Sequence, residues 1–248
     1  MKNILVSGCG GKMGRTLCNY LCSLPEYKLV AGVDPRLAGE PLRSIAPVGS
    51  DIAVFASIEE GLKSGNIDIA IDFTAPAAVV ANAIACLKCK IPILIGTTGI
   101  SAENQEKLDK LAKENHTSIM IVPNFAIGAI LMMNFAKIAA KLMKSAEIIE
   151  LHHDTKVDKP SGTAIKTRKA MLEAANKLEE ENNCQVFPIH SVRLPGLVAH
   201  QEVIFGDLGQ TLTIRHDTTS RDSFMPGIAM ALKQMGNFIG LKTGIDIE

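Results

Sequence analysis

The feature that most constrains the fold is a strict alternation of short apolar runs and helical patterns in the first half of the chain. Strands that alternate with helices build a parallel sheet, because neighbouring parallel strands are joined by a crossover connection. The sequence therefore predicts an α/β domain with a Rossmann-like, doubly wound parallel sheet. The expected strands are 3–7, 28–33, 51–55, 67–73, 92–95 and 118–122, and the expected helices are 12–23, a short helix after Ser57, 76–87 and 101–115.

The second half of the chain changes character after a helical pattern rich in Ile, Leu, Met and Ala. Strand patterns separated by glycine-containing turns then predominate, which predicts a smaller α+β domain with a mixed or antiparallel sheet. The expected helices are 128–143, one from Gly162 towards Glu181, and 223–238, and the expected strands are 147–151, 186–193, 199–205 and 211–217. We expect domains at 1–125 and 126–218, with 219–248 packing back on the first.

A glycine-rich turn joins the first expected strand to its helix. It consists of Gly8, Cys9, Gly10, Gly11, Lys12, Met13 and Gly14. Glycine lets the backbone approach a pyrophosphate, and the helix N-terminus stabilises the negative charge. The turn alone is weak evidence, since it is also typical of ordinary tight turns. Asp34 strengthens it by ending the second strand, where a carboxylate can bind ribose hydroxyls, and Arg36 could accept an extra phosphate instead.

Three further loops follow expected strands at their carboxyl ends, where open α/β sheets bind ligands. The first contains Phe73 and Thr74, the second contains Gly96, Thr97 and Thr98, and the third contains Val122, Pro123, Asn124 and Phe125. The second loop could be an ordinary strand-to-helix turn. Its position nonetheless favours contact with the nicotinamide side of a dinucleotide.

The segment from Glu150 to Ala164 carries the most specific chemistry. The strand pattern ends at adjacent imidazoles, His152 and His153, and Lys156 follows them closely. Ser161, Gly162 and Thr163 then begin a helix, whose first N–H groups lack partners and can hold an anion such as a carboxylate. A His pair or a Ser-Gly-Thr turn by itself is usually structural. Together, after a nucleotide-binding half, they predict a site that protonates an acidic substrate.

Composition narrows the class of protein. The 26 basic and 26 acidic residues balance, so nothing favours nucleic acid or an anionic membrane as a partner. The first apolar run is too short for a signal peptide and no run approaches a membrane span, so we expect a soluble, cytoplasmic protein. Cys86 and Cys89 have C-x-x-C spacing without a second pair, which favours reduced residues, and we expect no metal site.

These residues together resemble the dihydrodipicolinate reductase (4-hydroxy-tetrahydrodipicolinate reductase) family over nearly the whole chain. The glycine turn resembles the family's G-x-x-G-x-M-G motif, and Gly96–Gly99 and Pro123–Phe125 match further signatures. The segment with His152, His153, Lys156 and 160–164 is the most specific match. Arg221, Phe224 and Gly227 resemble the family's closing helix.

The resemblance implies reduction of a cyclic dicarboxylate imine to tetrahydrodipicolinate with NADH or NADPH, in lysine and diaminopimelate biosynthesis. It implies that His152 supplies a proton to ring carbon, that Lys156 assists as a cation or second donor, and that the substrate carboxylate is held at 161–163 and by His153. It also implies that the first domain holds the dinucleotide, and that the second binds substrate and forms a homotetramer through its sheets.

Three alternatives stay open on the sequence alone. Another two-domain oxidoreductase, such as an amino-acid dehydrogenase, would share the plan but needs a different set of polar residues. A protein that binds NAD without turnover would keep the glycine turn and Asp34 but has no need of His152 and Lys156. A metal hydrolase using His152 and His153 lacks a convincing third ligand.

Overall fold

The computed structural model describes residues 1–47, 52–181 and 184–247, and it divides into two compact units. Unit 1 comprises Met1–Phe125 and Met225–Asp246, and unit 2 comprises Ala126–Phe224. The chain therefore leaves unit 1 after the last predicted loop of the first half and returns to it at Met225. Residue 51, the start of the predicted strand 51–55, and residue 248, the end of the predicted returning segment, lie outside the described residues.

Unit 1 is built on a seven-stranded sheet in the order β13-β6-β5-β4-β1-β2-β3, and every strand pair is parallel. The strands are β1 (Lys2–Ser7), β2 (Tyr27–Val33), β3 (Val54–Phe55), β4 (Ile69–Asp72), β5 (Ile93–Ile95), β6 (Ser118–Ile121) and β13 (Gly240–Thr243). The predicted doubly wound parallel sheet is thus confirmed. Its edge strand β13 was not predicted, since its four residues lack an apolar pattern.

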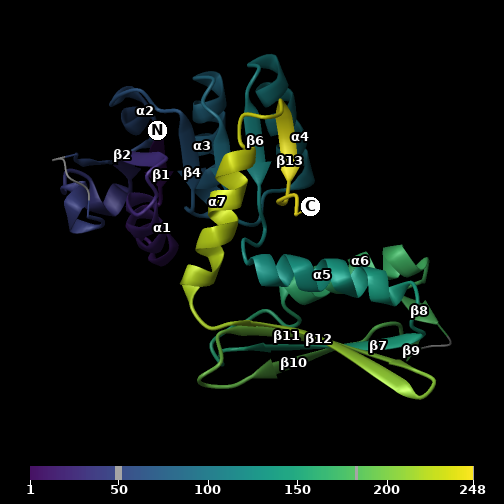
Figure 1. Cartoon of the computed structure of the whole chain (residues 1–248). Coiled ribbons are helices and arrows are strands. Elements are labelled where there is room, and N and C mark those ends of the chain that lie inside the picture. The colour runs from purple at the N-terminus through teal and green to yellow at the C-terminus, as the bar shows by residue number, and fades with distance from the viewer. Residues whose placement is uncertain (48–51, 182–183, 248) are drawn as a thin grey trace. The chain divides into compact units, whose positions relative to one another are not determined.

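Helices cover both faces of this sheet (Figure 1). They are α1 (Lys12–Cys22), α2 (Ile58–Lys63), α3 (Pro76–Lys88), α4 (Ala102–Glu114) and α7 (Met225–Gln234), with short 3₁₀ turns at Pro35–Leu37 and Leu42–Ser44. Helices α2, α3 and α4 share one buried cluster with the strands, whereas the buried residues of α1 and α7 lie outside it. Ser57 and Ser101 cap α2 and α4 by accepting backbone N–H bonds, which is the preferred use of Ser at this position.

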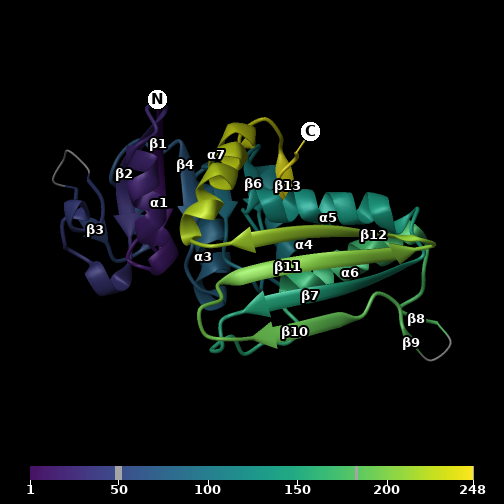
Figure 2. The same ribbon diagram turned by 60° about the horizontal axis from the view of Figure 1, so that its bottom comes forward.

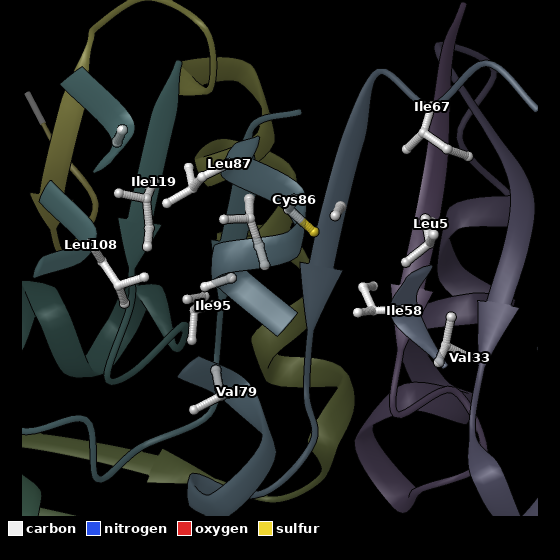
Figure 3. Close-up of a cluster of buried hydrophobic side chains, with 14 of the residues drawn as sticks. Leu5, Val33, Ile58, Ile67, Val79, Cys86, Leu87, Ile95, Leu108 and Ile119 are labelled. Carbon is white, nitrogen blue, oxygen red and sulfur yellow. The ribbon is translucent and has the colours of Figure 1, made fainter. Parts of the chain in front are cut away.

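The cluster beneath α2, α3 and α4 holds the sheet to its helices (Figure 3). Successive strand residues point to opposite faces, so Leu5 joins this cluster while its neighbours Ile4 and Val6 are buried elsewhere. Leu87 and Ile95, from α3 and β5, are fully buried in it. Each such side chain contributes about 1.5–3 kcal/mol relative to exposure. The rigid sheet fixes the carboxyl ends of its strands, where the candidate cofactor loops begin.

Unit 2 contains the predicted mixed sheet of four strands, in the order β10-β7-β11-β12 (Figure 2). The strands are β7 (Ser145–His152), β10 (Ile189–Arg193), β11 (Ala199–Asp207) and β12 (Gln210–Thr218). Helix α5 (Ile127–Ala140) precedes β7, and the 3₁₀ turn Arg221–Phe224 follows β12. Helix α6 (Gly162–Ala175) and the short hairpin of β8 (Glu180–Glu181) and β9 (Cys184–Gln185) lie between β7 and β10. Strand β10 runs parallel to β7, and the other two pairs are antiparallel. Helices α5 and α6 lie on one face of this sheet.

Two predicted helices were too long. The helix expected from Gly162 towards Glu181 ends at Ala175, because Asn176 adopts the left-handed conformation at φ 52° and closes the helix. The helix expected over 223–238 ends at Gln234, and Gly236, at φ +84°, turns the chain towards β13. In the part of the chain that the structure describes, no helix combines the length and hydropathy needed to span a bilayer.

Candidate active site

The glycine turn has the geometry of a close backbone approach. Gly8 lies at φ +79°, and a Cβ there would be 2.4 Å from the Phe73 carbonyl oxygen. A Cβ on Gly14 would be 2.0 Å from the Gly8 carbonyl oxygen, so α1 can begin this close to the turn only with glycine at that position. Gly11 caps α1 without a side-chain bond. The helix start therefore presents its unpaired N–H groups to a ligand.

The other residues of this turn have distinct surroundings. The side chain of Cys9 is buried beside β2, where a Cβ on Gly32 would lie 3.0 Å from its Sγ atom. Burial and the nearby Asp34 carboxylate raise the pKa of the Cys9 thiol to about 11, so it stays protonated. Lys12 is exposed and Met13 partly buried on the first turn of α1. Because its side chain is buried, Cys9 can contact a ligand only through its backbone.

Asp34, just after β2, binds both the glycine turn and its own neighbour. Its Oδ2 atom accepts the Gly10 N–H at 3.1 Å, and its two oxygens accept Arg36 Nε and Nη2 at 3.0 and 2.8 Å. The Arg36 bonds hold the pKa of Asp34 below its usual range although burial opposes this. The group suited to ribose hydroxyls and the group suited to an extra phosphate thus form one ion pair.

A cavity of about 560 Å³ opens beside this ion pair. Of the predicted cofactor residues, it is lined by Gly8, Gly11, Asp34, Arg36, Phe73 and Thr74. Sequence reasoning missed further lining residues: Pro35, Ala56, Ser57, Ile58, Ala75, Ala78 and Asn82. Ser7, Val33, Glu59 and Ala81 also line it. Pro35, Ala56 and Ser57 follow strand ends, which could have indicated them, whereas Ala78 and Asn82 lie inside α3 and had no such signal. A glycine cradle, a helix start and a carboxylate beside one cavity fit a dinucleotide.

The three remaining predicted loops meet at the carboxyl ends of β4, β5 and β6. The rings of Phe73 and Phe125 lie 5.6 Å apart with a tilt of 46°. Thr97 is buried and donates to Asp72 at 2.8 Å, whereas Thr98 is exposed. The backbone N–H groups of Gly96 and Val122 bond to the preceding strands at 2.9 Å each. Phe73 and Thr74 line the cavity, whereas the loops at 96–98 and 122–125 lie outside its lining and are connected to its wall through Phe73.

Unit 2 gathers its polar residues around Glu150, which is fully buried in β7. Its Oε2 atom lies 2.5 Å from His152 Nδ1. Arg193 donates from Nη1 to Oε2 and from Nη2 to Oε1, each at 2.8 Å. The Ser161 N–H donates to Oε1 at 3.2 Å. One carboxylate therefore joins the imidazole at the end of β7 to the start of α6.

Strand register explains this convergence. Glu150 and His152 point to the same face because they are two residues apart. Arg193 of β10 pairs with His152 across the parallel ladder. Ser161 caps α6 by accepting the Ala164 N–H at 3.2 Å. The geometry thus places a proton-carrying ring, a guanidinium and a helix N-terminus on one carboxylate.

Burial and hydrogen bonding act in opposite directions on the pKa values of Glu150 and His152. Burial would raise the pKa of Glu150, but the bonds from Arg193 and His152 outweigh it and hold the pKa below its usual value. Burial lowers the pKa of His152 below 6.5, and the bond and charge of Glu150 only partly oppose it. Glu150 therefore stays ionised, and the neutral ring of His152 donates Nδ1–H to it. Nε2 is the nitrogen left for a substrate.

The other predicted residues of this segment are only partly brought together. Lys156 Nζ bonds Asp158 Oδ1 at 2.7 Å, although its charge is close enough to lower the pKa of His152. His153 is exposed, and its Nδ1 lies 2.7 Å from Thr155 Oγ1. Gly162 and Thr163 form the first turn of α6.

A second hydrogen-bond chain anchors the start of α6 to the sheet. Gln201 of β11 donates to Thr167 Oγ1 at 2.8 Å, and Thr167 donates to the Thr163 carbonyl oxygen at 2.9 Å. All three residues are on or beneath the first two turns of α6, and both Thr167 and Gln201 are buried. This chain fixes the helix N-terminus with respect to the strand next to β7.

Sequence reasoning missed Glu150 as a member of the site and left the role of Arg193 open. The available signal was the position of Glu150, an acid in a strand where its alternating neighbours Ile148 and His152 share a face. His200, also left open, pairs with Asp217 at 2.6 Å on the opposite face. No cluster of three or more potential metal ligands occurs among the described residues.

Comparisons with known proteins agree over both halves. The family model described as "Dihydrodipicolinate reductase, N-terminus" matches residues 2–125. The model described as "Dihydrodipicolinate reductase, C-terminus" matches residues 128–245. The 4-hydroxy-tetrahydrodipicolinate reductase of Syntrophomonas wolfei is 44% identical over 94% of this chain and 92% of its own. That of Moorella thermoacetica is 40% identical over 98% and 96%.

Solved structures show the same similarity in three dimensions. A dipicolinate-bound dihydrodipicolinate reductase from Paenisporosarcina sp. TG-14 is 36% identical, with a TM-score of 0.86 over 98% of each chain. A myo-inositol dehydrogenase from Corynebacterium glutamicum is 14% identical, with a TM-score of 0.63 over 94% of this chain and 88% of its own. The second likeness shows the fold alone.

Proposed function

The chain belongs to the dihydrodipicolinate reductase family, and from that membership we propose that it reduces 4-hydroxy-tetrahydrodipicolinate to tetrahydrodipicolinate with a nicotinamide cofactor. This reaction serves lysine and diaminopimelate biosynthesis. The structural observation that best supports this proposal is the buried Glu150 carboxylate, which binds both His152 and the Ser161 N–H. The alternative of an amino-acid dehydrogenase is not favoured, because relatives over the full chain are reductases of this family.

Residues of unit 1 fit the cofactor. Gly8, Cys9, Gly10, Gly11, Lys12, Met13 and Gly14 would hold its pyrophosphate, Asp34 and Arg36 its adenosine ribose, and Phe73, Thr74, 96–98 and 122–125 its nicotinamide end. When bound, the cofactor supplies a hydride. We propose that both NADH and NADPH are accepted with a preference for NADH, since Asp34 disfavours a 2′-phosphate and Arg36 favours it.

Residues of unit 2 would bind the substrate and supply the proton. The first N–H groups of α6, at Gly162 and Thr163, would bind one carboxylate, and Lys156 and His153 would add charge and a hydrogen bond. His152 would take up a second proton on Nε2 and give it to the ring carbon. Glu150 would stabilise the resulting imidazolium, and Arg193 would keep Glu150 ionised. General acids placed in this way contribute about 10²–10⁴-fold.

The substrate's own charge supports this assignment. A dicarboxylate brings negative charge next to His152, which favours the imidazolium against the effect of burial. Lys156 would leave Asp158 for the substrate, so a single cation would stabilise both the bound acid and charge that develops during reduction.

An absorbance assay tests the proposed function. The unstable cyclic imine is generated in the cuvette, and oxidation of NADH or NADPH is followed in the parent protein. We expect oxidation that depends on the imine and is inhibited by dipicolinate, the ligand of the Paenisporosarcina relative. Oxidation no faster than in a control without the imine would contradict the proposal.

We also propose a cytoplasmic homotetramer that assembles through the sheet of unit 2. Cys9, Cys18, Cys22, Cys86 and Cys89 are free thiols, as expected in a reducing compartment. Leu151, Val192 and Ile204 point away from the face that α5 and α6 cover, and they are only partly buried. Sedimentation would distinguish a tetramer from a monomer.

A further inference from the structure

Asp72 is a buried acid that the proposed chemistry does not use. It is the last residue of β4 and is fully buried. β4 lies beside β1 in the sheet, and the parallel ladder pairs Asp72 with Ser7, immediately before the glycine turn. Among the ion pairs of the described residues, none includes Asp72. Burying a carboxylate without a cation is costly unless hydrogen bonds compensate.

Four neutral donors provide that compensation. Oδ1 accepts the Thr74 N–H at 3.0 Å, the Thr74 hydroxyl at 2.7 Å and the Thr97 hydroxyl at 2.8 Å. Oδ2 accepts Asn82 Nδ2 at 2.8 Å. All four bonds use carboxylate oxygens as acceptors, which is the pattern of an ionised acid.

These donors come from different parts of the cofactor site. Thr74 follows β4 and Thr97 follows β5, and Asn82 on α3 lines the cavity. The same amide of Asn82 reaches Ser7 Oγ at 3.3 Å. The backbone repeats the connection, since the Phe73 N–H bonds the Ser7 carbonyl and the Gly96 N–H bonds the Asp72 carbonyl, at 3.0 and 2.9 Å. The Asp72 carboxylate thus binds the loops after β4 and β5 and helix α3, and Asn82 extends these contacts to Ser7 at the end of β1.

We propose that Asp72 is a positioning residue that holds the loops at Thr74 and Thr97 and the Asn82 amide in the arrangement that binds the nicotinamide cofactor. The inference rests on the proposed function for the identity of the ligand. Asp72 acts through its neighbours, because its side chain has no exposed surface for contact with a ligand. Its loss should therefore weaken cofactor binding because the loops at Thr74 and Thr97 would no longer be held in place.

The pair of Asp72 and Asn82 permits a swap experiment. In Asp72→Asn, the Thr74 N–H keeps the amide oxygen at the Oδ1 position, so the new nitrogen faces Asn82. Asn82 then either opposes it with its own nitrogen or turns its amide over and gives up its donation to Ser7. Asn82→Asp alone places two carboxylates together. In the double variant Asp72→Asn/Asn82→Asp, an amide again faces a carboxylate with donor and acceptor exchanged, and the new Asp can accept from the Ser7 hydroxyl, to which Asn82 donates in the parent.

NADH dissociation constants are measured by equilibrium titration, without turnover, alongside thermal unfolding. We expect Asp72→Asn to weaken NADH binding about tenfold, which corresponds to about 1.4 kcal/mol, and the double variant to return within about threefold of the parent, in line with a lost and restored buried hydrogen bond. Binding by Asp72→Asn within twofold of the parent would overturn the proposal. So would a double variant that regains thermal stability but not affinity.

A matched control lies at the other end of the same strand. Asp68, just before β4, accepts the Asn3 N–H at 2.6 Å. Asp68→Asn should lower thermal stability without changing the NADH dissociation constant. An equal loss of affinity in this variant would show that general destabilisation of β4 is enough, and would overturn the specific role of Asp72.

A second pair of variants covers the case in which Asp72→Asn does not fold. Thr97→Val removes one donor and keeps the shape, and Thr97→Ser keeps the hydroxyl. We expect Thr97→Val to bind NADH at least about threefold more weakly than Thr97→Ser, and equal affinities would count against the proposal. If the parent itself bound neither NADH nor NADPH, the proposed function would fail before any variant is compared.

Discussion

Each unit of the molecule is organised around a fully buried carboxylate, and the two carboxylates are satisfied in opposite ways. Asp72 in unit 1 accepts hydrogen bonds from neutral groups, two threonines and an asparagine. Glu150 in unit 2 accepts from a guanidinium and an imidazole as well as from the backbone. The donors around Asp72 belong to two loops and to helix α3, whereas those around Glu150 include a group that can release a proton.

The difference indicates a division of labour. Neutral donors hold the backbone in place without adding a charge that would shift the pKa of a neighbouring group. This suits a site that binds a cofactor and transfers no proton. A carboxylate shared by Arg193 and His152 instead sets the protonation state of a ring, as suits chemistry. Substitutions near Glu150 should therefore act on rate, and substitutions near the glycine turn should act on cofactor affinity.

The largest effect should come from His152→Ala. Removal of the proton donor should lower kcat by about 10²–10⁴-fold. Steady-state kinetics with saturating NADH would measure it. His200→Ala is a matched control, because His200 pairs with Asp217 on the other face of the sheet, and it should keep nearly normal turnover. A His152→Ala variant with turnover close to that of the parent would remove His152 from the acid role.

Glu150→Gln should lower kcat/KM by about tenfold to a hundredfold, or about 1.4–2.8 kcal/mol. The parent's kcat/KM should fall as pH rises through the pKa of His152, which burial lowers from its ordinary value, because the acid must be protonated. Since Glu150 raises the pKa of His152, the substitution should move this midpoint to lower pH. An unchanged midpoint would mean that Glu150 has only a structural role.

Lys156→Ala should raise KM and lower kcat, about tenfold in kcat/KM, because a cation near the carboxylates stabilises both ground state and transition state. Lys159→Ala provides a nearby exposed lysine as a control. Both constants would be determined with the imine varied at saturating NADH. Values of kcat and KM within about twofold of the parent would show that Lys156 is only a surface residue.

Asp34→Ala should have the smallest effect and should act on unit 1 alone. Removing the carboxylate relieves repulsion of a 2′-phosphate and frees Arg36, so the preference for NADH should narrow by a few fold, about 1 kcal/mol or less. Specificity constants for NADH and NADPH in parent and variant would measure the change. A parent strongly selective for NADPH, or a shift of the variant further towards NADH, would contradict this use of Asp34.

The sequence predicted the elements that are defined by local patterns and missed those that are defined by contacts between distant residues. The parallel sheet was predictable because the strands and helices within residues 1–125 carry their own local patterns, and strand ends indicate loops. Strand β13 was missed because pairing with β6 and the bond from the Leu241 N–H to Asp109 at 2.8 Å define it, rather than its four residues.

In unit 2, the motif from His152 to Thr163 was visible because its residues are close in sequence. The Glu150–Arg193 pair was not, since 43 residues separate its members and only the strand order brings them together. The end of α6 at Asn176 was missed because the helical pattern continues beyond it, and a single left-handed residue decided the boundary.

The most direct test of the division is an equilibrium titration of NADH into Glu150→Gln. The two carboxylates act on different functions, so this variant should bind NADH within about twofold of the parent, although its kcat/KM is reduced. Thermal unfolding of the same sample would verify that it is folded. A dissociation constant raised about tenfold, as expected for Asp72→Asn, would contradict the separation of cofactor binding in unit 1 from proton transfer in unit 2.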